Sequence, residues 1–266
     1  MAVLRLDHVP ESIQVNVPLY IILPDPGKIK DQPVRDRKVL YLLHGLSDDG
    51  SAWQRFTSIE TYAHKNGLVV IMPSFGRSFY IDQPNGQAYF TYLVEELPKY
   101  IEDVFHLSPK RENTYIAGNS MGGYGAFKAA FLRPDLYQAA ASFSGVLSLA
   151  ILNNPNDKRQ EEFKYLFGDF SKLPGSEHDP AIWLKNAVEK KTQLPDLYIA
   201  CGTQEDVYPL SVYFHQACRS AGLNVHYHEE DAHHNWFFWD KQILRFLNEV
   251  LAPMPEAEII QEINNG

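Results

Sequence analysis

Gly118-Asn119-Ser120-Met121-Gly122 is the most informative segment of this sequence. It stands between a β-rich run, Thr114–Ala117, and a helix-like run, Tyr124–Leu132. A serine on a sharp turn from strand to helix is held in a strained backbone conformation, with its hydroxyl above the edge of the sheet. Glycines suit the flanking positions because strand and helix pass close together there. This context predicts that Ser120 is an acyl-transfer nucleophile.

The composition indicates a globular protein with a sizeable core. Of the 266 residues, 45% are apolar and 21% are charged, which is ordinary for a well-packed chain. The net charge of −9 comes from 24 basic and 33 acidic residues, and there is no stripe of Lys and Arg. Both features argue against a nucleic-acid partner. Two cysteines, Cys201 and Cys218, are too few for a disulfide framework and lack metal-type spacing.

The sequence also lacks the patterns of targeting and membrane segments. The N-terminal residues do not combine a basic region with a long apolar stretch, so they do not resemble a signal peptide. No apolar run approaches the roughly 18 residues of a membrane span. We therefore expect a cytoplasmic protein without membrane association.

Apolar runs typical of buried strands alternate with helical patterns along most of the chain. Expected strands lie at 12–23, 38–43, 68–72, 114–117, 139–143, 197–200 and 225–228. Expected helices lie at 51–65, 87–105, 124–132, 210–221 and 235–250, with a kink or break at Pro98. This alternation predicts an α/β fold with a mostly parallel central sheet and helices on both faces.

The segment 151–194 interrupts the alternation. It is polar, contains prolines and carries a cluster of aromatic residues. Because it is too long for a plain connection, we expect an insertion with short helices over the sheet. The insertion either forms a cap over the active site or simply packs on the surface. No repeat or linker divides the chain, so we expect a single domain over residues 1–266.

Ser120 needs a histidine to accept its proton and an acid to orient that histidine, because a serine hydroxyl is a poor nucleophile alone. In an open α/β arrangement the acid and then the histidine follow the serine, each on a loop after a later strand. His233 and His234 lie between the last expected strand and the last helix. We choose His234, which precedes Asn235-Trp236, as the base.

The candidate acids lie in the loop after the expected strand near residue 200. Glu205 and Asp206 are both placed there, and only one of them can reach the imidazole. The residues themselves do not choose between the two. Asp231 is too close in sequence to His234 to approach the ring easily, so we expect it to be a surface charge.

The remaining part of the expected site is an oxyanion hole. His44-Gly45-Leu46 ends an early strand, and the backbone N–H of Leu46 and that of Met121 are predicted to converge on the substrate carbonyl oxygen. For His44 we prefer a structural, hydrogen-bonded role to a catalytic one. Aromatic residues of nearby loops are candidates for an acyl pocket, although core packing is the commoner role; they are Phe75, Phe79, Tyr80 and Trp236.

Four segments, taken together, resemble one family. They are Tyr-Leu-Leu-His-Gly-Leu-Ser at 41–47, Ile-Ala-Gly-Asn-Ser-Met-Gly-Gly-Tyr-Gly at 116–125, Ala-Ser-Phe-Ser-Gly at 141–145 and His-Asn-Trp-Phe-Phe-Trp at 234–239. They resemble the tributyrin esterases of the esterase D group, which includes S-formylglutathione hydrolases and is related to carbohydrate-esterase feruloyl and acetyl-xylan esterases. The resemblance implies an α/β-hydrolase fold and hydrolysis of short-chain acyl esters without a metal or cofactor.

The resemblance also bears on the acid. The family usually has its aspartate three residues after a Cys-Gly glycine and three before a tyrosine. Counted from Gly202 and back from Tyr208, that position is Glu205. A glutamate can fill this role in α/β-hydrolases, so we favour Glu205, with Asp206 as the alternative if the loop shifts by one residue.

The resulting hypothesis is a serine carboxylesterase that hydrolyses short-chain acyl esters through an acyl-enzyme on Ser120. Alternatives within the enzymes are a thioesterase of the S-formylglutathione hydrolase type and an acetyl or feruloyl carbohydrate esterase. A different class is a non-catalytic binding protein on the same scaffold, which we would expect to lack a triad member, and none is missing. The expected partner is a small-molecule ester, and the resemblance also implies a homo-oligomer.

Overall fold

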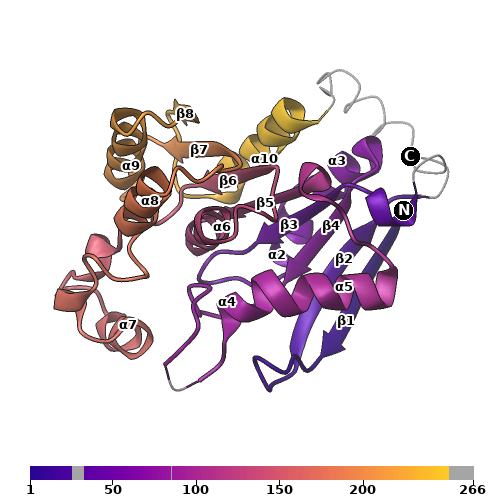
Figure 1. Cartoon of the computed structure of the whole chain (residues 1–266), viewed down its shortest axis with the longest axis horizontal. Helices are drawn as coiled ribbons and strands as arrows, with labels where there is room; N and C mark the ends of the chain where they lie inside the picture. The colour runs from indigo at the N-terminus through magenta and orange to yellow at the C-terminus, as the bar shows by residue number, and fades with distance from the viewer. Residues whose placement is uncertain (26–32, 85, 252–266) are drawn as a thin grey trace.

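The computed structural model describes residues 1–25, 33–84 and 86–251, so the domain expected over residues 1–266 includes segments outside the described residues. Within these residues, eight strands form one sheet in the order β1-β2-β4-β3-β5-β6-β7-β8 (Figure 1). They are β1 (Ala2–His8), β2 (Val17–Leu23), β3 (Val39–Leu43), β4 (Val69–Pro73), β5 (Thr114–Asn119), β6 (Ala139–Phe143), β7 (Asp196–Gly202) and β8 (Val225–Glu230). The strands from β4 through β8 pair in parallel, whereas β1 and β2 pair antiparallel at one edge. The prediction of a mostly parallel sheet is confirmed.

The sheet has a helical layer on each face, as predicted (Figure 1). Side chains of β3 alternate between the two layers, with Tyr41 in one apolar core and Leu42 in the other. One core includes residues of α5 (Leu97–Phe105), α6 (Met121–Leu132), α8 (Pro180–Glu189) and α9 (Tyr208–Ser220). The other includes residues of α2 (Ala52–Phe56), α3 (Ile59–Asn66) and α10 (Trp236–Val250). Among the described residues, no helix combines the length and apolarity needed to cross a bilayer.

Strand β1 was not among the predicted strands. Most of its side chains are exposed or half-buried, because it lies at the sheet edge and pairs only with β2 among the described strands. An edge strand of this kind carries a weak apolar signal, since little of it enters a core.

The single helix predicted at 51–65 is wrong, because α2 and α3 are separate. The hydroxyl of Thr57 donates to the carbonyl of Trp53 at 2.5 Å and accepts the N–H of Ile59 at 3.2 Å. The N–H of Ser58 donates to the Asp240 carboxylate of α10 at 2.9 Å. These bonds replace the helical ones at the break, and one of their partners comes from the far end of the chain.

The chain does not break at Pro98, which lies within α5; a π-helical stretch, Tyr92–Glu96, instead precedes it between α4 (Tyr89–Thr91) and α5. Because Pro98 has no N–H, the carbonyl of Val94 four residues earlier loses its usual helical donor. The guanidinium of Arg133 donates to that carbonyl at 3.5 Å.

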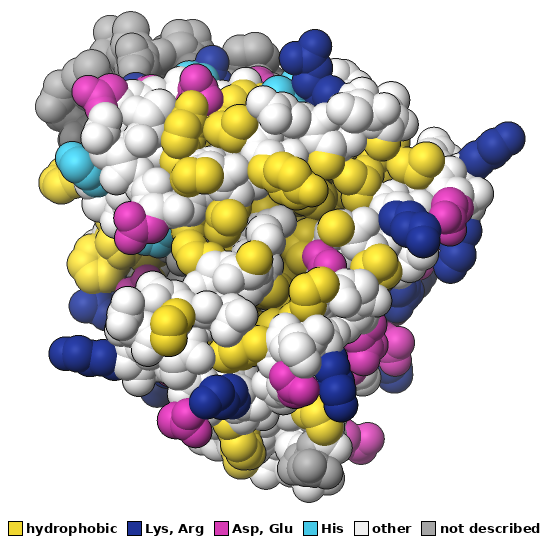
Figure 2. Space-filling view, turned by 90° about the vertical axis from the view of Figure 1, so that its left-hand side faces the viewer, with side chains coloured by type: hydrophobic (Ala, Val, Ile, Leu, Met, Phe, Trp, Pro, Cys, Tyr) yellow, Lys and Arg dark blue, Asp and Glu magenta, His cyan; other side chains and the backbone are white. Residues whose placement is uncertain are grey.

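The long connection between β6 and β7 holds short helices, as expected for the insertion. They are the 3₁₀ turn Leu149–Leu152, α7 (Gln160–Phe167), the 3₁₀ turn Phe170–Lys172 and α8. Figure 2 shows the face on which α7, α8 and α9 lie, where apolar side chains gather toward the middle. A groove of about 440 Å³ runs between α8 and α9 and includes the 64% exposed side chain of Tyr213. Exposed apolar surface of this kind often marks a contact with another molecule.

Candidate active site

Ser120 occupies the turn between β5 and α6 with φ 54° and ψ −118°. A residue other than glycine is rarely found in this region, and such strain costs about 1–3 kcal/mol. The Ser120 N–H donates to the Phe143 carbonyl at 2.8 Å. A Cβ on Gly118 would lie 2.4 Å from the Gly122 carbonyl oxygen, and one on Gly122 would lie 2.4 Å from that of Leu43. The glycines are therefore a steric requirement of the turn.

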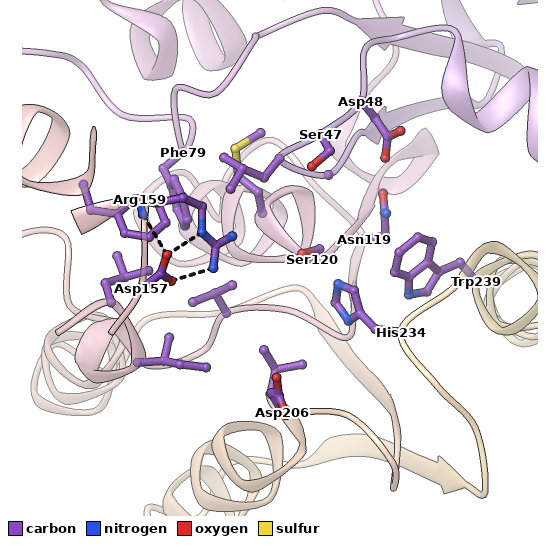
Figure 3. A pocket seen from close by; sticks show the side chains of 18 residues that line it. Ser47, Asp48, Phe79, Asn119, Ser120, Asp157, Arg159, Asp206, His234 and Trp239 are labelled. Carbon is purple, nitrogen blue, oxygen red and sulfur yellow. Dashed lines mark hydrogen bonds and ion pairs between the residues drawn. The ribbon is translucent and has the colours of Figure 1, made fainter. Parts of the chain in front are cut away.

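Ser120 lines a cavity of about 370 Å³ at the carboxyl ends of the parallel strands (Figure 3). His234, on the loop between β8 and α10, lines the same cavity, and Figure 3 shows its imidazole facing Ser120. Most of the wall is apolar: Leu46, Phe79, Met121, Val146, Ile151, Leu152, Phe163 and Val207. The two side chains proposed from the sequence, 114 residues apart, thus meet at one cavity.

Glu205 is the carboxylate that the structure brings to His234. Its Oε2 accepts from the imidazole Nδ1 at 2.6 Å, and its side chain is fully buried. Its Oε1 accepts from the Ser144 hydroxyl at 2.8 Å and from the Gly202 N–H at 2.7 Å. Asp206 is exposed and lines the cavity wall instead. Because a buried carboxylate needs its oxygens satisfied, these three donors hold Glu205 ready to orient the ring.

Ser144 and Trp239 were not predicted to take part in the site. Trp239 donates its indole N–H to the Ser144 hydroxyl at 3.0 Å, and its ring stands perpendicular to the His234 ring with centroids 4.9 Å apart. Ser144 follows β6 in a strained conformation with φ 52°. Both residues lie in segments that carry the family resemblance. Two signals in the sequence could have identified these residues: the serine directly follows a strand end, and the tryptophan lies five residues after the histidine.

The two residues predicted to supply the oxyanion hole, Leu46 and Met121, both lie at the cavity wall. Met121 is the first residue of α6, so its N–H has no partner within the helix. Leu46 is the second residue of a turn that the N–H of Asp48 closes on the Gly45 carbonyl at 3.2 Å, and this bond does not engage the Leu46 N–H. Both residues line the cavity together with Ser120.

His44 has the structural place expected for it. The ring is fully buried, its Nδ1 donates to the Gly45 carbonyl at 2.7 Å and its Nε2 accepts the Phe75 N–H at 2.9 Å. Burial lowers the pKa of His44 to about 4. The neutral ring therefore joins the loop after β3 to the loop after β4 and supports the turn that carries Leu46.

The structure places the remaining candidate residues in the cavity wall, in the core or at the surface. Phe79 lines the cavity, whereas Phe75 and Tyr80 are buried in the core behind it. Trp236 packs against the ring of Trp53, with centroids 5.1 Å apart, and is not part of the cavity wall. The exposed Asp231 accepts a hydrogen bond from Gln204, as a surface charge would. His233 is exposed and lies outside the wall.

The insertion supplies one side of the cavity. Ile151, Leu152, Asp157, Arg159 and Phe163 line it. Arg159 is paired with Asp157, with Nη2 and Oδ2 2.7 Å apart, and its guanidinium lies 5.2 Å from the centroid of the Phe163 ring. The bonds from Arg159 lower the pKa of Asp157 to about 2. The insertion therefore forms part of the cavity wall, and its role as a cap stays a prediction.

The other charged side chains of the wall are carboxylates. Asp48 and Asp206 join Asp157 on the wall, so the wall carries three carboxylates and a single guanidinium. Asp48 is half-buried, and burial together with the neighbouring Asp49 raises its pKa. A ligand with a negative charge therefore meets an unfavourable field in this cavity.

A strained serine on a strand–helix turn, beside a histidine held by a carboxylate on an α/β sheet, defines the serine hydrolases of the α/β-hydrolase fold. Comparison with known proteins agrees. Residues 11–250 match the family described as "Putative esterase", and the chain belongs to that family. The protein is a serine esterase.

Relatives that cover nearly the whole chain carry related activities. An acetyl esterase of Caldicellulosiruptor saccharolyticus is 29% identical over 91% of this chain and 96% of its own. The substrate-bound structure of FphF, a fluorophosphonate-binding serine hydrolase of Staphylococcus aureus, is 32% identical with a TM-score of 0.86, covering 94% of this chain and 98% of that one. An S-formylglutathione hydrolase from the same organism is 32% identical with a TM-score of 0.84 and the same coverage.

Proposed function

We propose that the protein hydrolyses short-chain acyl esters, acetyl esters above all, through an acyl-enzyme on Ser120. The observation that carries the proposal is the contact of 2.6 Å between Glu205 and His234 at the cavity that Ser120 lines. A histidine so held has its Nε2 free to accept a proton from the serine. The small, apolar cavity suits a short acyl chain.

In the first half of the reaction, Nε2 of His234 takes the Ser120 proton as Oγ attacks the ester carbonyl carbon. The carbonyl oxygen becomes an oxyanion, and the N–H groups of Leu46 and Met121 donate to it. Collapse of the tetrahedral intermediate breaks the ester C–O bond. The imidazolium gives its proton to the leaving alcohol, and the acyl group stays on Oγ.

In the second half, water replaces the alcohol. His234 takes a proton from the water as its oxygen attacks the acyl-enzyme, and the same two amides stabilise the second oxyanion. The acid leaves, and the imidazolium returns its proton to Ser120. Glu205 stays ionised throughout and stabilises the imidazolium in both halves.

The charge of the cavity supports an uncharged substrate. Asp48, Asp157 and Asp206 outnumber Arg159, which is already paired. S-formylglutathione carries two carboxylates and one ammonium, so it would approach against this field. The acetyl esterase relative covers the chain almost fully, and its named activity fits an uncharged ester.

Thioester hydrolysis is the second candidate, because the S-formylglutathione hydrolase of Staphylococcus aureus is among the most similar folds. A comparison of kcat/KM on p-nitrophenyl acetate, S-formylglutathione and methyl ferulate separates the candidates. We expect kcat/KM to be highest on p-nitrophenyl acetate. A higher value on S-formylglutathione would replace our proposal with the thioesterase, and one on methyl ferulate with a feruloyl esterase.

Ser120→Ala tests the nucleophile itself. We expect the variant to fold and to lose p-nitrophenyl acetate turnover by at least about a thousandfold. Activity at the wild-type level would exclude Ser120 as nucleophile. The cytoplasmic location remains a prediction, as does the homo-oligomer, which light scattering on the purified protein would test.

A further inference from the structure

The side chain of Arg77 joins three parts of the cavity wall. Arg77 lies on the loop after β4, and its Nε and Nη2 donate to the Glu162 carboxylate of α7, with Nη2 and Oε2 2.7 Å apart. Its Nη1 donates to the Leu46 carbonyl at 3.3 Å. One guanidinium thereby ties the insertion to the turn that carries a predicted oxyanion amide, in the fork geometry that arginine favours.

The bond to Leu46 restrains that turn. One backbone bond closes it, from the Asp48 N–H to the Gly45 carbonyl at 3.2 Å. Peptide groups rotate as rigid planes about the Cα atoms that join them. The Leu46 carbonyl belongs to the peptide group between Leu46 and Ser47, so a bond to this carbonyl limits the rotation of that group. The neighbouring peptide group, between Gly45 and Leu46, carries the Leu46 N–H and is restrained in turn. Arg77 thus acts on the direction in which that N–H points.

On its other side, Arg77 depends on where α7 lies. Phe163 follows Glu162 directly in α7 and lines the cavity. Its ring packs edge-on against Phe79, with centroids 5.7 Å apart, and Arg159 lies over it. A substrate that fills the cavity contacts this wall. Contacts that set the position of Phe163 also set the position of the carboxylate that holds Arg77.

We propose that Arg77 is a positioning residue. Through Arg77, the position of α7 against the substrate affects the orientation of the Leu46 N–H. The inference rests on the proposed function, because that orientation matters only if the amide binds an oxyanion. Contacts between the substrate and α7 then raise kcat as well as the affinity for the substrate. The Arg77 and Glu162 side chains are 43% and 30% exposed, and such pairs contribute little to stability. The effect of the pair should therefore appear in kcat and hardly in the melting temperature.

The test compares Arg77→Met, Glu162→Gln and the double variant on p-nitrophenyl acetate. Removing a whole oxyanion donor costs about a hundred- to a thousandfold, so loss of its positioning should lower kcat about tenfold in Arg77→Met. Glu162→Gln should lower kcat by about threefold, since the bond to Leu46 remains. We expect KM within about twofold of the wild type in all three, and a double variant no worse than Arg77→Met.

The matched control is Arg35→Met, which removes an exposed arginine 3.5 Å from the Glu102 carboxylate, outside the cavity wall. It should leave kcat unchanged, and Arg77→Lys, which keeps one donor, should recover part of the loss. A trifluoromethyl ketone, which forms the tetrahedral adduct, should bind Arg77→Met about tenfold more weakly, in step with kcat.

Three results would overturn the inference: a kcat of Arg77→Met within twofold of the wild type, a loss confined to KM, or a double variant whose loss equals the product of the single losses. If Arg77→Met does not fold, Glu162→Gln and Arg77→Lys decide by the same criteria. Ser120→Ala is measured alongside. Activity that survives it defeats the proposed function, whereas a wild-type kcat in Arg77→Met beside an inactive Ser120→Ala defeats only the coupling.

Discussion

The two sides of the cavity are built in different ways. On one side, Glu205 is fully buried and its contacts with His234, Ser144 and Gly202 all measure 2.6–2.8 Å. On the other side, the insertion relies on ion pairs of partly exposed arginines, 43% exposed for Arg77 and 51% for Arg159. Buried, fully satisfied polar groups hold one geometry, while exposed pairs are weak and screened by salt.

This difference suggests a division of labour. The buried side keeps the proton-transferring groups in place whatever the substrate, because its hydrogen bonds are costly to break. The insertion side can adjust to the substrate at little cost. Changes on the buried side should therefore reduce turnover for every ester, whereas changes to the Asp157–Arg159 pair of the insertion should alter selectivity.

The largest expected effect is that of Glu205→Gln. The amide keeps the shape of the side chain but removes the charge that stabilises the imidazolium, so kcat on p-nitrophenyl acetate should fall by about 10³–10⁴. Asp206→Asn is the control and should stay within about threefold of the wild type, because Asp206 lies on the wall and not at the ring. Collapse of Asp206→Asn alone would reverse the assignment of the acid.

The second prediction concerns stability at acidic pH. The pKa of His44 is lowered to about 4 in the folded protein, against about 6.5 in an unfolded chain. Between these values the unfolded state binds a proton that the native state does not, so the free energy of unfolding rises with pH across this window. The contribution is complete above pH 6.5 and amounts to at most about 3 kcal/mol.

Urea unfolding from pH 4 to pH 7 measures this effect in the wild type and in His44→Gln, whose side chain does not titrate. The free energy of unfolding of the wild type should rise more steeply with pH than that of the variant, since all other groups are shared. Parallel curves would show that His44 does not contribute to the pH dependence.

The third prediction concerns a variant that keeps Glu205 but removes one of the hydrogen bonds that hold its carboxylate. Ser144→Ala deletes one of the two donors to Oε1 of Glu205 and leaves the indole N–H of Trp239 without its acceptor. Loss of one such buried bond corresponds to about a tenfold lower kcat. Trp239→Phe keeps the ring against His234 and should cost less than Ser144→Ala. Equal kcat in Ser144→Ala and the wild type would mean that this network does not reach the reaction.

The smallest expected effect belongs to the insertion side. Asp157→Asn removes the negative charge beside Arg159, so kcat/KM on S-formylglutathione should rise about threefold while that on p-nitrophenyl acetate stays unchanged. Glu161→Gln removes the same charge from the insertion at an 86% exposed side chain and serves as the control. Equal gains in the two variants would point to a general charge effect and not to the cavity.

The fold and the pair Ser120 and His234 could be predicted from the sequence, because their signals are local motifs or follow from the order of the strands. The turn at Ser120 needs glycines at fixed spacing, and the position of His234 follows from strand order. Glu205 could be preferred over Asp206 by counting between Gly202 and Tyr208 within the resemblance.

What the sequence did not predict depends on contacts between distant residues. Ser144 lies 61 residues from Glu205 and 95 from Trp239. The break between α2 and α3 uses Asp240, which lies 182 residues from Ser58. The bridge from Arg77 to Glu162 spans 85 residues and joins a loop to the insertion. No periodicity or motif encodes such pairs, because only the packed sheet brings them together.

Trapping the acyl-enzyme shows directly which residue is the nucleophile. The protein is mixed with p-nitrophenyl acetate, quenched in acid within the first turnovers, digested, and analysed by tandem mass spectrometry. We predict an acetyl group on Ser120 in the wild type and none in Ser120→Ala, with much slower formation of the adduct in Glu205→Gln. Acetylation of another residue in step with turnover, or full turnover by Ser120→Ala, would contradict this prediction.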